Sequence, residues 1–144
     1  MERFVAERLL RFSDCDPSGI AYFPAYLNLL NGVVEDFWRY LGFSLPELIK
    51  GRGIGTPTVQ LDCQFERPAT FGEQLTFLLS VVKLGKSSLH LAHEITGADG
   101  TKWSARQVLV ATSLTEHRPT PWPQDVRGSL CKHFPALRAD REPS

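Results

Sequence analysis

A carboxylate stands in a tight turn just before the start of a predicted helix. Residues 16–19 are Asp-Pro-Ser-Gly, and aspartate, proline and glycine occupy the positions that they favour in a type I β-turn. Pro24 is tolerated in the first turn of a helix, where its missing N–H would have no intrahelical partner, so a helix is predicted to begin near Phe23 or Pro24. Unpaired N–H groups at a helix start favour the negative oxygen that develops when a carbonyl carbon is attacked. Asp16 could attack such a carbon itself or take a proton from an attacking water.

The sequence leaves the role of Asp16 open in two respects. It does not choose between a nucleophile and a general base, and the side chain could instead only hydrogen-bond within its own turn. Because Pro24 has no N–H, the candidate donors to a carbonyl oxygen are the backbone N–H groups of Phe23, Ala25 and Tyr26. We favour the catalytic interpretation because the turn and the helix start occur together.

Other reactive side chains near this motif are weaker candidates. Asp14 is expected to order the loop, and Cys15 has no histidine close in sequence and would point away from Asp14 and Asp16. Glu35 is a second carboxylate, on the predicted helix, and we interpret it as a solvated helix charge. Asp16 is therefore the favoured catalytic carboxylate.

The four histidines do not form a predicted metal or catalytic site. His90 and His93 are three residues apart on a predicted strand, so their side chains face opposite sides of a sheet and do not share a metal ion. His117 and His133 lie in the tail. We expect surface or structural roles for all four, and neither a metal nor another cofactor.

Residues 26–41 have the pattern of an amphipathic helix. Apolar residues recur at helical spacing on a wide face, polar residues form a narrow strip, and Gly42 supplies a C-terminal stop. The helix is expected to be mostly enclosed, with only the strip meeting water, a ligand or a partner. The strip contains Asn28, Asn31, Glu35 and Arg39.

Five segments have the composition of strands. Residues 59–65 alternate between apolar and polar side chains, and residues 74–84 are apolar on both faces, which predicts a central strand. Glycine-containing turns at 85–87 and 97–100 predict successive antiparallel hairpins. The predicted strands are residues 4–12, 59–65, 74–84, 89–95 and 103–114.

One helix on one face of a roughly five-stranded antiparallel sheet is an α+β domain. We predict a single domain over residues 1–144, with an irregular, proline-rich tail from about residue 117. A single helix cannot cover such a sheet completely, and an exposed edge strand can pair with another chain, so we expect a dimer that continues the sheet.

The composition is that of an ordinary soluble domain of 144 residues with zero net charge, 16 basic against 16 acidic side chains. This balance argues against nucleic acid or a membrane surface as the main partner. The chain opens without a leader or a long apolar span, and its three cysteines are widely separated. We therefore expect a cytoplasmic protein with reduced thiols.

The motif in residues 14–26 and the order of the elements resemble the hot-dog-fold acyl-CoA thioesterases, specifically the 4-hydroxybenzoyl-CoA thioesterase-like family. The resemblance covers about residues 4–114, with supporting similarity at 52–57. It implies a five-stranded antiparallel sheet wrapped around one long helix, subunits that pair into a continuous sheet and often form tetramers, and active sites at subunit interfaces. The motif consists of Asp16-Pro17-Ser18-Gly19-Ile20 and then Pro24-Ala25-Tyr26.

The resemblance also implies roles for individual residues. The family's catalytic aspartate falls on Asp16, and the backbone N–H that polarises the thioester carbonyl falls on Phe23. Coenzyme A enters as part of the substrate, and its thiol, with a pKa of roughly 8.5, leaves as a thiolate without a strong general acid. The residues implied in substrate binding are Tyr22, Asn31, Thr58, Lys86 and Ser87.

This chain departs from the family where the family contacts its substrate. In the turn that aligns with the family's basic, nucleotide-contacting turn, Lys86 stands in place of arginine, while Gly85 and Ser87 replace other basic residues. Phosphate recognition is therefore expected to be weaker or shared with cations elsewhere. Asn31 stands where the 4-hydroxybenzoyl enzyme has an aspartate, and Phe23 where it has a tyrosine. We expect an aromatic or otherwise apolar acyl group rather than 4-hydroxybenzoyl itself.

The leading hypothesis is an acyl-CoA thioesterase that works as a dimer or a dimer of dimers. Whether the acyl carrier is coenzyme A or a protein-bound pantetheine is left open. One alternative is a hydratase or dehydratase on the same fold, which normally pairs a histidine with a carboxylate and is disfavoured because no histidine precedes residue 90. The other is a non-catalytic acyl-CoA-binding module.

Overall fold

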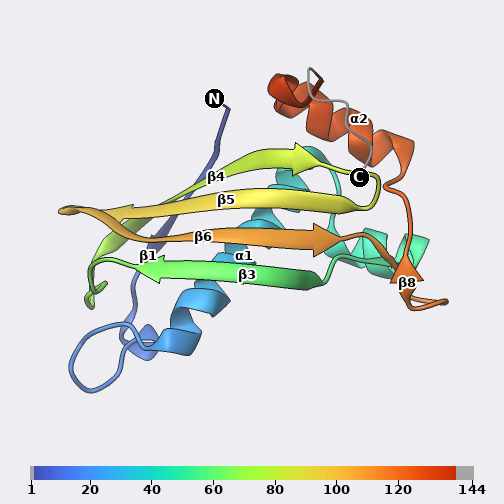
Figure 1. Ribbon diagram of the computed structural model, residues 1–144. Coiled ribbons are helices and arrows are strands. Elements are labelled where there is room, and N and C mark those ends of the chain that lie inside the picture. The colour runs from blue at the N-terminus through green and yellow to red at the C-terminus, as the bar shows by residue number, and fades with distance from the viewer. Residues whose placement is uncertain (1, 139–144) are drawn as a thin grey trace.

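A five-stranded antiparallel sheet forms the frame of the protein, and α1 (Phe23–Leu41) lies along one of its faces (Figure 1). The structure is a computed structural model and describes residues 2–138. The predicted α+β class is confirmed. In spatial order the strands are β1 (Phe4–Leu9), β4 (Gln74–Leu84), β5 (Ser88–Gly97), β6 (Gly100–Val110) and β3 (Thr58–Phe65).

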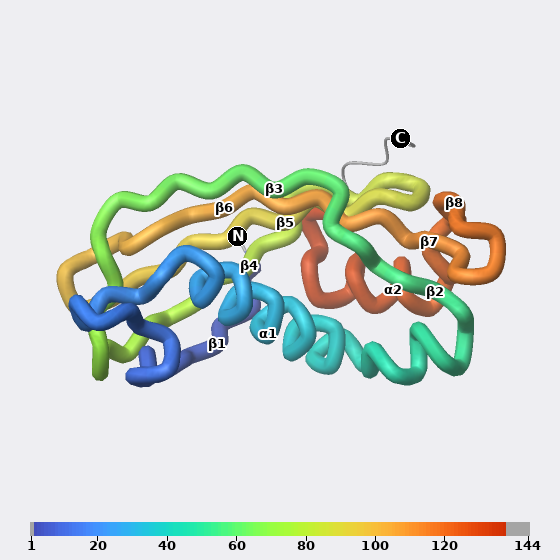
Figure 2. Tube along the Cα trace, turned by 90° about the horizontal axis from the view of Figure 1, so that it is seen from below, coloured from blue at the N-terminus to red at the C-terminus, as the bar shows by residue number. Residues whose placement is uncertain are grey.

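The helix α1 begins and ends where the sequence predicts. Pro24 lies in its first turn, and Gly42 ends it in the left-handed conformation, with a φ of 102°. The predicted polar strip is exposed along its whole length, and the opposite face is buried under the sheet, which arches over the helix (Figure 2). The helix is thus anchored by its apolar face while its first turn stays accessible.

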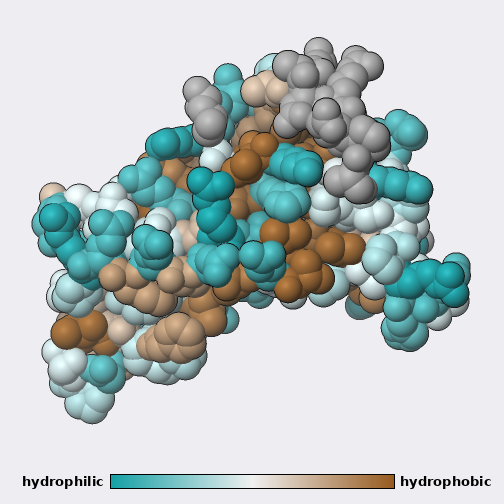
Figure 3. Space-filling model, in the orientation of Figure 1, coloured by the Kyte–Doolittle hydropathy of each residue, from teal (hydrophilic) through white to brown (hydrophobic). Residues whose placement is uncertain are grey.

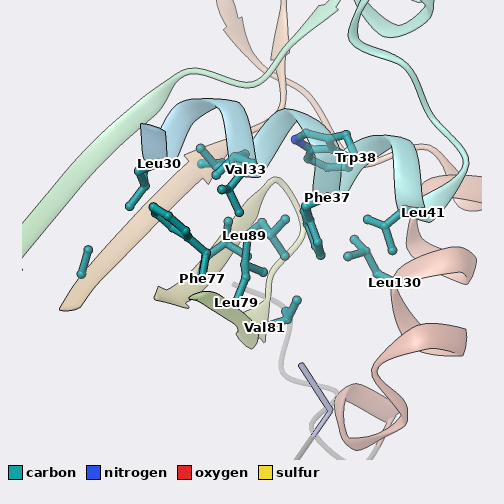
Figure 4. Packing of buried hydrophobic residues seen from close by; sticks show 14 of the residues in the cluster. Leu30, Val33, Phe37, Trp38, Leu41, Phe77, Leu79, Val81, Leu89 and Leu130 are labelled. Atoms are coloured by element: carbon teal, nitrogen blue, oxygen red, sulfur yellow. The ribbon is translucent and has the colours of Figure 1, made fainter. Parts of the chain in front are cut away.

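Apolar side chains on the inner face of the sheet pack against α1 and form the core (Figure 4). Phe77 and Leu79 of β4 and Leu89 of β5 meet Val33 and Phe37 of the helix, and all five are almost fully buried. Burial of each such side chain contributes about 1.5–3 kcal/mol relative to exposure. This core holds α1 in a fixed position on the sheet.

The strands do not all form successive hairpins. β4, β5 and β6 are consecutive hairpins as predicted, but β3 pairs with β6 and lies at the far edge, so the chain crosses the sheet between β3 and β4. β4 is an interior strand, whereas the middle position belongs to β5. The predicted hairpins are therefore confirmed, and the partner of β3, which the sequence did not predict, is new, because an alternating pattern identifies a strand but not its partner.

Two predicted strands are shorter than expected. β1 ends at Leu9, and the residues that follow form the 3-10 turn η1 (Phe12–Asp14). β6 ends at Val110, and the chain then enters a small second sheet. That sheet contains β2 (Ile54–Gly55), β7 (Thr112–Ser113) and β8 (Arg118–Pro119), with the π-helical turn η2 (Glu47–Gly51) before it.

The tail is not irregular, which corrects the prediction and adds a second helix. It forms α2 (Gln124–His133) and η3 (Pro135–Arg138), and α2 packs against the C-terminal half of α1. Val126 and Leu130 are buried, and Trp122 stacks near Trp38 with ring centroids 5.6 Å apart. The prolines flank α2 instead of interrupting it, and apolar residues four apart fix its buried face.

The described residues add three general facts. None of their helices has the length and apolar character needed to cross a membrane. All three cysteines are free thiols. The predicted single domain runs over residues 1–144, of which residues 1 and 139–144 lie outside the described residues.

Candidate active site

The predicted turn at Asp16 is present. The Asp16 carbonyl oxygen accepts the Gly19 N–H at 2.9 Å, and the Asp16 N–H donates to the Ile20 carbonyl oxygen at 3.0 Å. Gly19 has a φ of 81°, a conformation that side chains with a Cβ rarely adopt. The backbone therefore fixes the position of the Asp16 side chain.

The Asp16 carboxylate uses one oxygen for the turn and leaves the other free. Oδ1 accepts the Ser18 N–H at 2.9 Å and also the Ser18 hydroxyl, whereas Oδ2 has no hydrogen-bond partner within residues 2–138. The hydrogen bond from the Ser18 side chain, followed by that from its N–H, lowers the pKa of Asp16 below its usual value. Asp16 is exposed, so its free oxygen is ionised and accessible at neutral pH. Turn formation and chemistry are thus compatible roles for this side chain.

The start of α1 presents an unpaired donor. Among the described residues the Phe23 N–H has no acceptor, and no side chain caps the helix. The Ala25 N–H donates to the Tyr22 carbonyl oxygen at 2.9 Å, so Ala25 is not a free donor as the sequence allowed. The Tyr22 N–H bonds to the Asp14 carbonyl oxygen at 3.2 Å, which ties the helix start to the turn that carries Asp16.

Exposed aromatic rings surround this helix start. Phe23 is 60% exposed and Phe65 is 46% exposed, and their ring centroids lie 6.0 Å apart. Tyr22 is also exposed. Large apolar side chains on a surface often mark a site for a ligand or another chain.

The predicted substrate-binding residues fall into two groups within one chain. Tyr22 lies beside Phe23, but Thr58, Lys86 and Ser87 lie at the other end of the sheet, where the Ala111 N–H bonds to the Ser87 carbonyl oxygen. Phe65 packs on Phe23, and Thr58 is seven residues away along β3, about 24 Å at roughly 3.4 Å per residue. A single chain therefore does not bring these two groups together.

Asn31 stands apart from both groups. It is exposed on α1, eight residues after Phe23, and therefore about 12 Å further along the helix axis. Its amide is accessible on the polar strip, as the sequence predicts for a residue that meets a ligand or a partner. Its contact with a substrate remains a prediction.

Thr58 ends a chain of hydrogen bonds that begins in the core. Its hydroxyl oxygen accepts Nε2 of Gln107 at 2.9 Å, and Oε1 of Gln107 lies 2.8 Å from Nε2 of His93. Burial lowers the pKa of His93 to about 4, against a smaller opposing effect from Gln107, so the imidazole is neutral at pH 7. His93 is therefore structural, while His90 is only half-buried.

The remaining candidates behave as the sequence indicates. The Asp14 carboxylate accepts the Arg11 N–H at 3.0 Å and so orders the loop. Burial, followed by the charges of Asp14 and Asp16, raises the pKa of the Cys15 thiol, which disfavours the reactive thiolate. Glu35 is exposed on α1. Within the described part of the chain, no three metal-ligating side chains gather into a group that could hold an ion.

A buried ion cluster near the turn went unnoticed in the sequence. Lys102 Nζ lies 3.0 Å from Glu73 Oε2 and 2.6 Å from Asp99 Oδ1, and it donates to the Pro68 carbonyl oxygen at 3.2 Å. The alternation of a strand would turn Lys102 away from the buried Trp103 and towards solvent, so the sequence carried no clear signal for its burial. Which residues pair with Lys102 depends on the fold.

A groove of about 690 Å³ lies on the sheet face turned away from α1, where polar and apolar side chains mix (Figure 3). None of the candidate site residues lines it. Ser80 lines the groove opposite Ala92, and His93 also borders it, but Nε2 of His93 is paired with Oε1 of Gln107. Among the described residues Ser80 has no hydrogen bond to a base, so the groove shows no activated nucleophile.

Comparisons with known proteins agree with the fold. A family model described as the thioesterase-like superfamily matches residues 10–130. A 1,4-dihydroxy-2-naphthoyl-CoA hydrolase of Synechocystis sp. is 26% identical over 133 residues, covering 91% of this chain and 96% of its own. A solved gentisyl-coenzyme A thioesterase is 28% identical with a TM-score of 0.80, covering 88% of this chain and 99% of its own. The 4-hydroxybenzoyl-CoA thioesterase of Pseudomonas sp. is 22% identical with a TM-score of 0.80, over 90% and 99%. The predicted hot-dog fold is confirmed.

Proposed function

Because the chain belongs to the thioesterase-like superfamily, a family of thioester hydrolases, we propose that it hydrolyses an aromatic or otherwise apolar acyl-CoA thioester to the free acid and coenzyme A. One observation carries this proposal. The Asp16 carboxylate has a free oxygen next to a helix start whose Phe23 N–H is unpaired. A carbonyl carbon between them meets both an attacking group and a donor for its oxygen.

The reaction uses these two groups in order. The thioester oxygen accepts the Phe23 N–H, and the positive end of the α1 dipole stabilises the negative charge as the carbonyl is attacked. In one route Asp16 attacks the carbon, the C–S bond breaks, and water hydrolyses the resulting acyl anhydride. In the other, Asp16 takes a proton from water as the water attacks, and returns it to the departing thiolate. A thiolate leaves readily, so neither route requires a histidine.

The acyl group occupies the apolar surface around the helix start. Tyr22, Phe23 and Phe65 are exposed there, which supports an aromatic or aliphatic acyl chain. Asn31 offers an amide on the exposed strip of α1, where an aspartate would accept a hydroxyl proton more strongly. The 4-hydroxybenzoyl group itself is therefore not assigned.

Two copies of the chain form the complete site. β3 is an edge strand, and its Val59 is 60% exposed, so a second β3 can extend the sheet in the antiparallel direction. A two-fold axis across this edge places the start of one β3 opposite the end of the other. The Thr58 and Lys86 end of one chain then lies near Asp16 and Phe23 of its neighbour. This arrangement supports a dimer, and a dimer of dimers stays a further prediction.

Coenzyme A reaches across this interface. Its thioester lies at Asp16, and its phosphates extend towards Lys86 and Ser87 of the other copy. Lys86 is exposed in the turn between β4 and β5, where a lysine can contact a phosphate. Because Lys86 contacts the phosphates through its charge, the affinity for coenzyme A is expected to fall as salt is added.

Thiol release from a panel of acyl-CoA substrates tests the proposal. The panel contains benzoyl-, hydroxybenzoyl-, phenylacetyl- and straight-chain acyl-CoA, and each is assayed with wild type, Asp16→Asn and Glu35→Gln. Loss of the carboxylate in Asp16→Asn is expected to lower kcat by about 10²–10⁴, whereas Glu35→Gln retains activity. Retained turnover in the first variant and loss in the second would reverse the assignment. Tight binding of acyl-CoA without thiol release by wild type would indicate a non-catalytic binding module.

A further inference from the structure

The turn that carries Asp16 is fastened to the loop between β3 and β4. The Ala21 N–H donates to the Ala69 carbonyl oxygen at 2.9 Å, and the Phe71 N–H donates to the Gly19 carbonyl oxygen at 2.9 Å. These bonds close an antiparallel bridge on both sides of Ile20. The position of the turn therefore depends on the position of this loop.

The loop is held in turn by a buried ion pair. Lys102 Nζ lies 3.0 Å from Glu73 Oε2 and donates to the Pro68 carbonyl oxygen at 3.2 Å. The other carboxylate oxygen of Glu73, Oε1, accepts the Thr70 N–H at 3.1 Å. One cation thus fixes both ends of the segment that bonds to Gly19 and Ala21.

This pair takes two charges largely out of water. The side chain of Lys102 is 5% exposed and that of Glu73 is 12% exposed. Removing charges from water costs several kcal/mol per ion, and apolar replacements of such pairs are often neutral or stabilising. Stability alone therefore does not account for this pair.

The neighbouring strand leaves room for the pair. A Cβ atom at Gly97 would collide with Oε2 of Glu73 and lie 2.6 Å from Cε of Lys102. Gly97 ends β5 and has an ordinary backbone conformation, since its φ does not lie in the left-handed region. Glycine is therefore needed at this position to leave space for the ion pair, and not to allow an unusual backbone conformation.

We propose that Lys102 and Glu73 are positioning residues for the reaction, which hold the loop at 68–72 so that Asp16 faces the start of α1. This inference rests on the proposed function. A displacement of about 1 Å in a reacting group can lower a rate a hundredfold, so the pair acts on kcat. The proposed coenzyme A contacts at Lys86 come from the opposite end of the other copy's sheet, so they are expected to stay unchanged.

The test compares Lys102→Met with two control variants. Lys102→Met keeps an unbranched side chain, one atom shorter, but removes its charge, and it is expected to lower kcat about ten- to hundredfold with little change in KM. Lys102→Arg keeps a cation and is expected to recover part of kcat. Arg52→Met breaks the bidentate pair with Asp125 between η2 and α2, and is expected to leave kcat unchanged.

Amide hydrogen exchange supplies a readout that does not depend on chemistry. Lys102→Met is expected to speed exchange in a peptide covering residues 14–26 but not in one covering residues 44–53. If Lys102→Met does not fold, Glu73→Gln and Asp99→Asn are measured in the same two ways, with the larger effect expected for the buried Glu73. Folded variants with wild-type kcat overturn the proposal, whether or not exchange is faster.

Failure of the proposed function has a different signature. In that case wild type releases no thiol from the panel, or Asp16→Asn remains active. If only the positioning role is wrong, wild-type turnover and its dependence on Asp16 remain, and Lys102→Met behaves like Arg52→Met.

Discussion

The two ends of the molecule are stabilised by different kinds of contact. At the α2 end, Trp122, Val126, Leu130 and Phe134 are buried against α1. At the Asp16 end, by contrast, Phe12 and Phe71 form an exposed pair with ring centroids 5.5 Å apart. The backbone there is secured by hydrogen bonds between main-chain groups and by the buried ion cluster around Lys102.

This difference suggests that one end of the chain contributes mainly to folding stability and the other mainly to the reaction. At the α2 end, the apolar face of α2 is buried against α1, and this packing contributes mainly to stability. The Asp16 end has unpaired groups and exposed rings, which a substrate and a second copy would cover. Substitutions at the two ends should therefore affect different measurements.

The largest expected effect on stability comes from the α2 end. Leu130→Ala removes a fully buried side chain that packs near Leu41 and Phe37, so the free energy of unfolding should fall by about 2–5 kcal/mol. The matched change at the other end, Phe71→Ala, removes an exposed ring and should alter it by about 0.5 kcal/mol or less. Denaturant unfolding measures both. Equal losses would contradict the contrast between the two ends, as would a changed kcat in folded Leu130→Ala.

A smaller effect is expected from the hydroxyl that contacts Asp16. The hydrogen bond from Ser18 lowers the pKa of Asp16, so Ser18→Ala should raise that pKa. Because the ionised form is active, the acid limb of kcat/KM should move to higher pH, while activity at neutral pH changes little. Thiol release measured from about pH 3 to pH 7 reports this limb, with Ser18→Thr as the variant that keeps a hydroxyl. An acid limb that stays in place would mean that Asp16 does not set it.

Much of the fold follows from local patterns in the sequence. The strand at residues 74–84 was predicted with its observed bounds because apolar side chains alternate through it on both faces. Gly42 and Pro24 marked the ends of α1 through backbone rules that hold in any context. The place of β3 beside β6 was not predictable in this way, since the pairing joins residues that are 38 (Phe65 with Trp103) to 51 (Thr58 with Leu109) positions apart. The helix α2 was missed because four prolines near it outweighed the spacing of Val126 and Leu130.

The part of the candidate site that local sequence features encode was predicted, and the rest was not. The turn at Asp16 and the donor at Phe23 are local features, and the structure contains both. Their catalytic roles stay a prediction. Asp99 lies only three residues from Lys102, but Pro68 and Glu73 are far from it along the chain, and no local pattern links them to it. That Phe65 packs on Phe23, which places Thr58 far from the helix start, likewise became visible only with the sheet in place.

The most direct test of this account is thiol release by mixed dimers. Two variants are mixed. One carries Asp16→Asn, which impairs the catalytic end of its chain, and the other carries Lys86→Glu with Ser87→Asp, which impairs the phosphate-binding end of its chain. If the two ends meet across two copies, one of the two sites in every mixed dimer carries none of these substitutions. Equal amounts of the two variants, unfolded and refolded together, should then recover about a quarter of the wild-type kcat/KM. A mixture no more active than the average of the two variants would show that both ends of the site belong to the same chain, and would contradict the account.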